Sequence, residues 1–163
     1  MKLFNLFICI LIAILALSGC TSQTSPTKDD WFATTKNARD KLLEYLSLGD
    51  RDGIKSLLSE NLANKEDIDR DISDSITFFG GKVVSYDNKR SSVDKAGGSK
   101  DDGKWTLIVS SGIIFDIHTE SGRQLDSLYV SFEPVNTESP EDVGIIAYYI
   151  KDTDGNAIEV SLR

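Results

Sequence analysis

The stretch ITFFGGKVVSYD, residues 76–87, decides the fold because the spacing of apolar residues changes within it. Before Gly80 the apolar residues recur every three or four positions, which is typical of an amphipathic helix. After Gly81 they alternate with polar residues, which is typical of a strand with one buried face. We therefore expect helices before this glycine pair and an antiparallel sheet after it, an α+β plan.

Three helices are expected before the glycine pair. The first starts at Trp31 and ends at Gly49, with a stripe at helical spacing formed by Trp31, Thr35, Ala38, Leu42, Tyr45 and Leu46. The second is short, is capped by Asp50 or Asp52, and turns Ile54, Leu57, Leu58 and Leu62 inward. The third begins at Asn64 as its cap and buries Ile68, Ile72, Ile76 and Phe79.

After the glycine pair, the alternation predicts up to five strands. They are residues 82–87, 104–119, 123–133, 143–151 and 157–162, whereas residues 88–103 and 134–141 are predicted to be exposed loops. Gly112, within the long second strand, is expected to mark a bulge or a bend. Neither layer can hide its apolar side alone, so the three helices should cover one face of a curved sheet of four to five strands.

The segment GDRDGIKSLLSE, residues 49–60, lies between the first and third helices. Together with the strands that follow, it resembles the nuclear transport factor 2-like (cystatin-like) superfamily, and especially a group of uncharacterised bacterial lipoproteins within it. The resemblance covers most of residues 31–162 and implies a cone-like domain. It implies no particular activity, because such domains serve as isomerases, dehydratases, ligand binders and interaction modules. No motif assigns a role to the strand tyrosines Tyr86, Tyr129, Tyr148 and Tyr149.

The N-terminus has the parts of a secretory signal peptide, which is not part of the fold. Lys2 is followed by an apolar run over residues 3–17 and then by Ser18-Gly19-Cys20. The run is shorter than the roughly 18–20 residues that a membrane-spanning helix needs. Residues 17–20, LSGC, resemble the cleavage box of bacterial lipoprotein precursors, which implies that Cys20 receives a diacylglycerol and becomes the first residue. An ordinary signal peptide that ends near a cysteine is the alternative.

This interpretation divides the chain into a signal peptide (1–19), the lipidated Cys20 with a polar tether (20–30), and one α+β domain (31–163). Because two acyl chains hold a protein stably on a bilayer, we expect a lipid-anchored domain at the extracytoplasmic face of a cell membrane. Thr21 leaves open which membrane carries it in a cell that has two.

The composition excludes several classes of function. The chain has 26 acidic and 18 basic residues and a net charge of −8, which becomes more negative when Lys2 leaves with the signal peptide. Such acidity argues against a nucleic-acid partner, because binding a polyanion requires clustered lysine and arginine. The cysteines are Cys9 and Cys20, so the mature domain has no disulfide, thiol nucleophile or thiolate metal site. No cofactor is expected.

The residues that suggest chemistry each have a structural explanation as well. In a strand, Asp116, His118 and Glu120 would share one face and form a weak pocket candidate, for binding a metal or moving a proton. The alternative is a solvent-facing strand end with Phe115 and Ile117 in the core. Residues 152–156, DTDGN, echo part of a calcium loop but also fit a tight hairpin turn.

Two other groups are interpreted as parts of the fold. Residues 97–100, GGSK, superficially resemble a phosphate-binding loop but are predicted to form a flexible loop. The third helix carries the carboxylates of Asp67, Asp69, Asp71 and Asp74, which read as a solvated acidic face.

These observations favour a binding or interaction module of the cell envelope, held on the lipid bilayer through Cys20, with a small ligand or an envelope protein as its partner. The alternative is a small cofactor-free enzyme, isomerase-like or hydrolase-like, that uses the cone pocket. A purely structural role is a third hypothesis. The sequence identifies no catalytic residue and does not fix the oligomeric state, although related domains often pair through the sheet.

Overall fold

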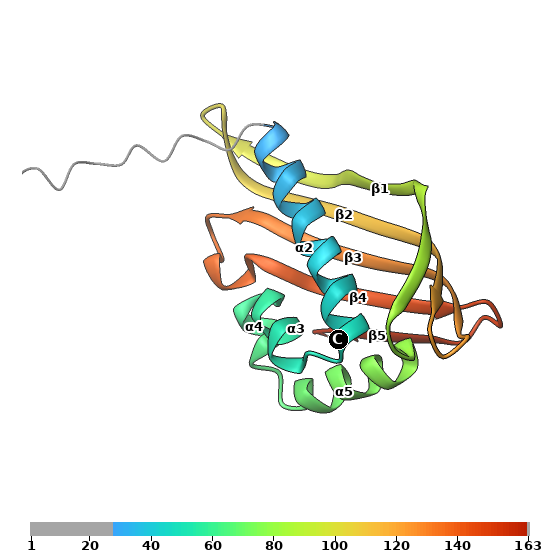
Figure 1. Ribbon diagram of the computed structural model, residues 1–163. Coiled ribbons are helices and arrows are strands. Elements are labelled where there is room, and N and C mark those ends of the chain that lie inside the picture. The colour runs from blue at the N-terminus through green and yellow to red at the C-terminus, as the bar shows by residue number, and fades with distance from the viewer. Residues whose placement is uncertain (1–27, 163) are drawn as a thin grey trace, which may run out of the picture.

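Four helices and then five strands make up residues 28–162, the part of the chain that the computed structural model describes (Figure 1). The helices are α2 (Lys28–Leu48), α3 (Arg51–Leu57), α4 (Glu60–Ala63) and α5 (Ile68–Phe79). The strands are β1 (Val83–Asp101), β2 (Lys104–Thr119), β3 (Gln124–Asn136), β4 (Gly144–Asp152) and β5 (Ala157–Ser161), and a 3-10 turn, η1 (Pro140–Asp142), precedes β4. The predicted α+β class is confirmed, and the change from helix to strand falls at the glycine pair.

The predicted first helix is α2, and its stripe faces the sheet. Trp31, Thr35, Ala38, Leu42 and Leu46 are buried, whereas Tyr45 is half-buried. The helix begins at Lys28, so the last three residues of the predicted tether are helical. Gly49 follows the helix with φ +69, a conformation that glycine adopts without steric cost.

The second predicted helix is wrong as one continuous element, because the chain breaks between α3 and α4. Asp50 caps α3 by accepting a hydrogen bond from the backbone N–H of Gly53 at 2.9 Å. Leu58 then becomes extended and forms a parallel bridge with Ile145 of β4. The N–H of Ser59 donates to the carbonyl oxygen of Ile145 at 2.9 Å, and the Ser59 side chain caps α4. Pairing with the sheet therefore interrupts the helix.

The third predicted helix starts later than expected. Asn64 ends α4, and Asp67 is the N-cap residue of α5. The predicted stripe is correct in its direction, since Ile68, Ile72 and Phe79 are buried and Ile76 is half-buried. α5 ends at Gly80, which has the left-handed conformation with φ +86.

The strands form one antiparallel sheet in chain order, β1-β2-β3-β4-β5. The predicted bounds of the last four strands are close to the observed ones. β3 extends to Asn136, however, so only part of residues 134–141 forms a connection.

The prediction of an exposed loop over residues 88–103 is wrong. These residues belong mostly to a long edge strand. β1 continues to Asp101, which pairs with Lys104 at the start of β2. Figure 1 shows β1 changing direction along its length, where register shifts interrupt its pairing with β2. Backbone hydrogen bonds at a sheet edge do not require apolar side chains, so a polar, glycine-containing stretch can still pair.

Gly112 is not a bulge, because it pairs in regular register with both neighbouring strands. Its missing side chain makes room for Arg39 of α2, a residue that is not part of the predicted stripe. A Cβ atom on Gly112 would lie 2.8 Å from Cδ of Arg39. The Arg39 side chain is only 4 % exposed, and its Nη1 donates to the carbonyl oxygen of Ser92 on β1 at 2.9 Å. The glycine therefore lets α2 approach the sheet closely.

The helices pack against one face of the sheet, and an apolar core fills the space between the two layers (Figure 1). Its fully buried side chains include Leu42, Leu46, Ile54, Phe79 and Tyr148. A smaller cluster of Trp31, Val93 and Ile108, with Trp105 and Val135 against it, lies where α2 begins. None of the described helices combines the length and apolar character needed to cross a membrane.

Candidate functional site

The face of the sheet that points away from the helices carries large side chains that stay partly exposed. One row crosses four strands, because Ile113 on β2 pairs with Tyr129 on β3, Tyr129 with Tyr149 on β4, and Tyr149 with Glu159 on β5. Tyr129 is 37 % exposed, and Ile113 and Tyr149 are half-buried. The next row contains Ser111, Ser131 and Ala147. We call these seven residues the outer sheet face.

The residues between these positions point toward the helices, as alternation along a strand requires. The hydroxyl of Ser110 on β2 is buried and lies 2.7 Å from that of Thr35 on α2. Val130 and Tyr148, which alternate with the tyrosines of the row, are fully buried. The described helices thus leave the outer sheet face uncovered. An uncovered surface with aromatic side chains and few charges is typical of a region that binds another molecule.

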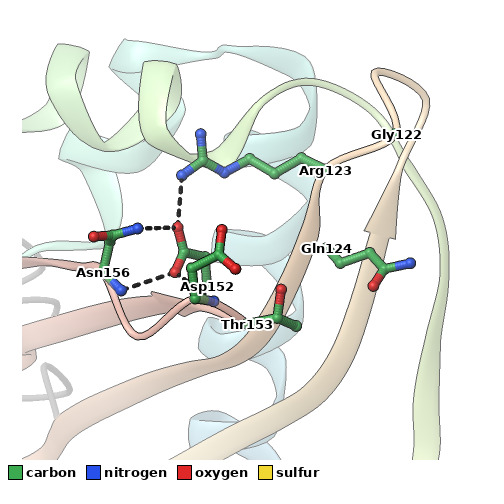
Figure 2. A pocket seen from close by; sticks show the side chains of 7 residues that line it. Gly122, Arg123, Gln124, Asp152, Thr153 and Asn156 are labelled. Atoms are coloured by element: carbon green, nitrogen blue, oxygen red, sulfur yellow. Dashed lines mark hydrogen bonds and ion pairs between the residues drawn. The ribbon is translucent and has the colours of Figure 1, made fainter.

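An open polar depression of about 510 Å³ lies at one end of the sheet, where the β2–β3 turn meets the β4–β5 turn (Figure 2). Its lining comes from both turns: Gly122, Arg123, Gln124, Asp152, Thr153, Asp154 and Asn156. Figure 2 shows the Arg123 side chain directed toward the carboxylate of Asp152. Nη2 of Arg123 donates to Oδ2 of Asp152 at 3.2 Å, and the guanidinium lies 4.3 Å from the ring centroid of Phe78. The arginine therefore joins α5 to the two turns.

Asp152 organises the β4–β5 turn. Its Oδ1 accepts hydrogen bonds from the backbone N–H groups of Asp154 (3.1 Å) and Asn156 (2.8 Å). Its Oδ2 accepts one from the side-chain amide of Asn156 (3.0 Å) and the one from Arg123. The side-chain hydrogen bond from Asn156, with the other donors, holds the pKa of Asp152 below its ordinary value.

These four donors occupy the carboxylate oxygens that a calcium ion would need, so the hairpin explanation accounts for DTDGN. Within residues 28–162, no group of three or more His, Cys, Asp or Glu side chains is arranged to hold a metal ion.

The weak pocket candidates of the sequence lie outside this depression. Nε2 of His118 is 3.0 Å from Oδ1 of Asp116, and the two side chains are 38 % and 61 % exposed. Glu120 lies in the exposed turn after β2. The structure therefore brings Asp116 and His118 together at the surface of β2 and does not enclose them.

Strict alternation is wrong near Asp116. This residue has φ +52, and the buried positions of β2 change parity there. Ile117 is buried, as expected, but Phe115 is only half-buried, and the guanidinium of Arg90 lies 4.6 Å from its ring centroid. A residue in the left-handed region shifts which side chains reach the core, and no sequence signal marked this position.

The remaining candidates are parts of the fold. Residues 97–100 belong to β1 and pair with β2, so the prediction of a flexible loop there is wrong. On α5, Asp67, Asp69 and Asp71 form ion pairs with Arg70, Lys55 and Lys65, respectively, and Asp74 is exposed. Most carboxylates of this acidic face are therefore paired with neighbouring basic side chains.

Tyr148 is the strand tyrosine that points into the core, whereas Tyr86, Tyr129 and Tyr149 keep partial exposure. The hydroxyl of Tyr148 lies 2.8 Å from that of Ser75 on α5. Burial raises the pKa of Tyr148 to about 12. This tyrosine is therefore neutral at physiological pH and joins α5 to the sheet.

Sequence reasoning missed the roles of Arg39 and Arg123, because each depends on partners far away along the chain. Arg39 also pairs with the adjacent Asp40 at 2.6 Å. Burial raises the pKa of Asp40, but hydrogen bonds from Lys36 and Arg39 outweigh burial and hold it below its ordinary value. The one available signal for Arg39 was Gly112, since a glycine inside a strand marks a close approach by another group.

Cys20, the predicted lipidation site, lies outside the described residues, as does the predicted signal peptide. Among known families, the one described as Domain of unknown function (DUF5104) matches residues 41–154. This range contains α3, α4, α5 and the strands from β1 to β4, together with Arg123 and Asp152. No curated protein matches the chain.

Proposed function

The chain belongs to the DUF5104 family, and we propose that it is a lipid-anchored cell-envelope protein whose outer sheet face binds another envelope component. The observation that carries this proposal is the uncovered row formed by Ile113, Tyr129 and Tyr149. These side chains lie on regular strands, so they form a rigid surface that loses little conformational entropy on binding. Aromatic residues contribute much of the binding energy at protein interfaces.

The lipid anchor is proposed from the sequence. Residues 17–20, LSGC, match the cleavage box of lipoprotein precursors, and the basic start and apolar run before them suit export. Processing at this point gives Cys20 as the first residue, with two acyl chains to hold it on the extracytoplasmic face of the membrane. The mature chain then reaches the start of α2 after a short polar segment.

A cone-like, cystatin-like domain over residues 31–163 is also part of the proposal. It is supported by the order of helices before an antiparallel sheet and by the core between those two layers. The resemblance carried by residues 49–60 supports it further, because these residues form α3 and the start of α4 and contact β4.

Binding is favoured over catalysis because of what fills the space between helices and sheet. An enzyme that used a cone pocket would need an accessible polar cavity there. Phe79 and Tyr148 are instead fully buried in that space, and the hydroxyl of Tyr148 is paired with Ser75. The Asp116 and His118 pair lies on the exposed surface. The outer sheet face is therefore the better candidate site.

The binding surface is tested by replacing Tyr129 with a photoreactive amino acid in the protein expressed in its native organism. Leu48, which is 59 % exposed at the end of α2, provides the matched control position. We expect ultraviolet light to attach one defined envelope component to the protein labelled at residue 129 but not at residue 48. Tyr149→Glu should reduce that product, because it places a charge in the middle of the surface. Equal products from both positions would refute the proposed surface.

The anchor is tested separately with Cys20→Ser. Cells fed a fatty acid with an alkyne tag should label the wild-type protein and not the variant, and only the wild type should remain with membranes after a high-salt wash. A Cys20→Ser protein that keeps both the label and the membrane association would rule out the anchor.

A further inference from the structure

We infer that the end of the molecule at which α2 begins rests on the membrane surface, with Phe32 in contact with the lipid headgroups. The inference rests on the proposed anchor at Cys20. It is carried by the reach of the tether, by the aromatic side chains at this end and by the charge balance of the hairpin beside them.

The chain between the anchor and α2 limits which end can reach the bilayer. Cys20 lies about eight residue steps before Lys28, where α2 begins. Eight steps span at most about 29 Å, the length of a fully extended chain. α2 has 21 residues and is about 31 Å long, so its two ends cannot both stay near the anchor. The start of α2 is the end held at the bilayer.

Both tryptophans of the chain lie at this same end. Trp31 packs with Val93 and Ile108, and Trp105 contacts the same cluster from the start of β2. The ring of Phe32 meets that of Trp31 edge-on, with 6.1 Å between centroids, and Phe32 is 40 % exposed.

The direction of Phe32 follows from helix geometry. Side chains in a helix point back toward its N-terminus, so Phe32 is directed toward the side from which the tether arrives. Aromatic side chains are enriched at the level of lipid headgroups, where one part of the ring system is buried and another stays wet. An exposed phenylalanine whose ring contacts the buried ring of Trp31 suits that environment.

The tip of the β1–β2 hairpin carries balanced charge, whereas α2 begins with Lys28, Asp29 and Asp30, a net charge of −1. Figure 1 shows the β1–β2 hairpin at the same end of the molecule as the start of α2. Lys100 and Lys104 balance Asp101 and Asp102 at its tip, and Nζ of Lys100 lies 4.3 Å from the ring centroid of Trp105. The whole chain carries a net charge of −8, so this tip is repelled less by anionic lipids than the average surface. The acidic helix α5 lies at the other end of the molecule (Figure 1).

The test uses the chain from Cys20 onward, coupled through Cys20 to a maleimide phospholipid in phosphatidylcholine vesicles. Cys20 is the only cysteine once residues 1–19 are removed, so the coupling is specific. Part of the phosphatidylcholine carries a nitroxide on its headgroup, which quenches tryptophan emission at short range, and both tryptophans report on the same end. Phe32→Ser is the test variant. Leu48→Ser, 59 % exposed at the other end of α2, is the matched control.

We expect the nitroxide lipid to quench the coupled wild type and Leu48→Ser to the same degree. Phe32→Ser should lower the ratio of membrane-resting to detached domains about fivefold, because the exposed part of the ring no longer enters the headgroup layer. Absence of quenching in the coupled wild type would overturn the inference and indicate that this end is free or faces another component. An equal loss in both variants would also overturn it. Because the coupling supplies the anchor chemically, these outcomes do not depend on whether cells lipidate Cys20.

Discussion

Gly112→Ala should destabilise the protein when Arg39 is present and should be harmless when Arg39 is removed. The new Cβ atom would lie 2.8, 3.1 and 3.2 Å from Cδ, Cγ and Cβ of Arg39. The arginine cannot swing away freely, because its guanidinium is bound to Asp40 and to the carbonyl oxygen of Ser92. Overpacking of this kind costs about 1–3 kcal/mol.

The same substitution has an opposing effect through the unfolded chain. Gly112 is not in the left-handed region, so alanine can adopt its backbone conformation, and the loss of chain entropy in the unfolded state favours alanine by about 0.4–1 kcal/mol. Arg39→Ala removes the two closest atoms, Cδ and Cγ. In that background we expect Gly112→Ala to be neutral or stabilising, which reverses the sign of its effect.

The assay is urea unfolding of the four proteins of this cycle, made from Cys20 onward and followed by tryptophan emission. The comparison is valid if the dependence of the unfolding free energy on urea is the same in all four. A coupling free energy of about 1–3 kcal/mol between the two sites is expected, because the unfolded-chain effect is the same in both backgrounds and cancels. If Gly112→Ala costs the same in both backgrounds, the close approach of Arg39 is not what requires glycine.

Three further predictions concern the contacts that hold the layers and turns together. Gly144 has φ +131, and Gly144→Ala places a Cβ atom 2.8 Å from the backbone nitrogen of Ser59, so the free energy of unfolding in urea should fall by about 2–4 kcal/mol. Gly155→Ala is the control: φ is +89 and the space around it is open, so its cost should be about 1 kcal/mol. Tyr148→Phe should cost about 1 kcal/mol at pH 7. The folded pKa of Tyr148, about 12, exceeds the ordinary tyrosine value of 10, so the free energy of unfolding of the wild type should fall between pH 10 and pH 12 by at most about 1.4 kcal/mol per pH unit relative to that of Tyr148→Phe. If the free energies of unfolding of the two proteins kept a constant difference over this range, the buried hydroxyl would be contradicted. The pKa of Asp152 is lowered in the fold, so its contribution to stability is present above the ordinary aspartate pKa and is lost as the pH falls through the folded pKa. Asp152→Asn should remove this part of the loss of stability in acid. If the free energies of unfolding of wild type and variant fell in the same way at low pH, the role of these hydrogen bonds would be contradicted.

The helices and the last four strands could be predicted because their signals are local. The stripe of α2 and the alternation of β3 each place apolar residues on one side of a regular element, and Gly49 and Gly80 end the helices that precede them. The main error concerned residues 88–103, which are polar, contain glycine and belong mostly to β1. Pairing with β2 decides this segment, and composition does not report the partner of an edge strand.

The candidate site was less predictable than the fold. Alternation assigned Tyr129 and Tyr149 to strands, but the sequence could not tell which side of the sheet the helices would leave uncovered. The contact of Arg123 with Asp152 joins two turns that no motif relates. The parity change at Asp116 depends on a left-handed residue that is not glycine, which sequence patterns rarely reveal.

Residues 49–60 make contacts that shape the chain between α2 and α4. Gly49 supplies the left-handed end of α2, and Asp50 caps α3. A Cβ atom on Gly53 would lie 2.5 Å from Oδ2 of Asp50 and 2.8 Å from Cδ1 of Tyr45, so that position also serves packing. None of these residues lies on the outer sheet face, so a shared fold does not require a shared partner.

The same separation makes the proposed surface testable. The large side chains of the core lie on the opposite side of the sheet from Tyr129 and Tyr149. Substitutions that keep strand propensity on the outer sheet face, such as Tyr129→Thr, should therefore change stability by about 1 kcal/mol or less. A loss of partner capture in such a variant can then be attributed to the surface itself. If Tyr129→Thr unfolded the domain instead, the outer sheet face would belong to the core, and the proposed function would lose the observation that carries it.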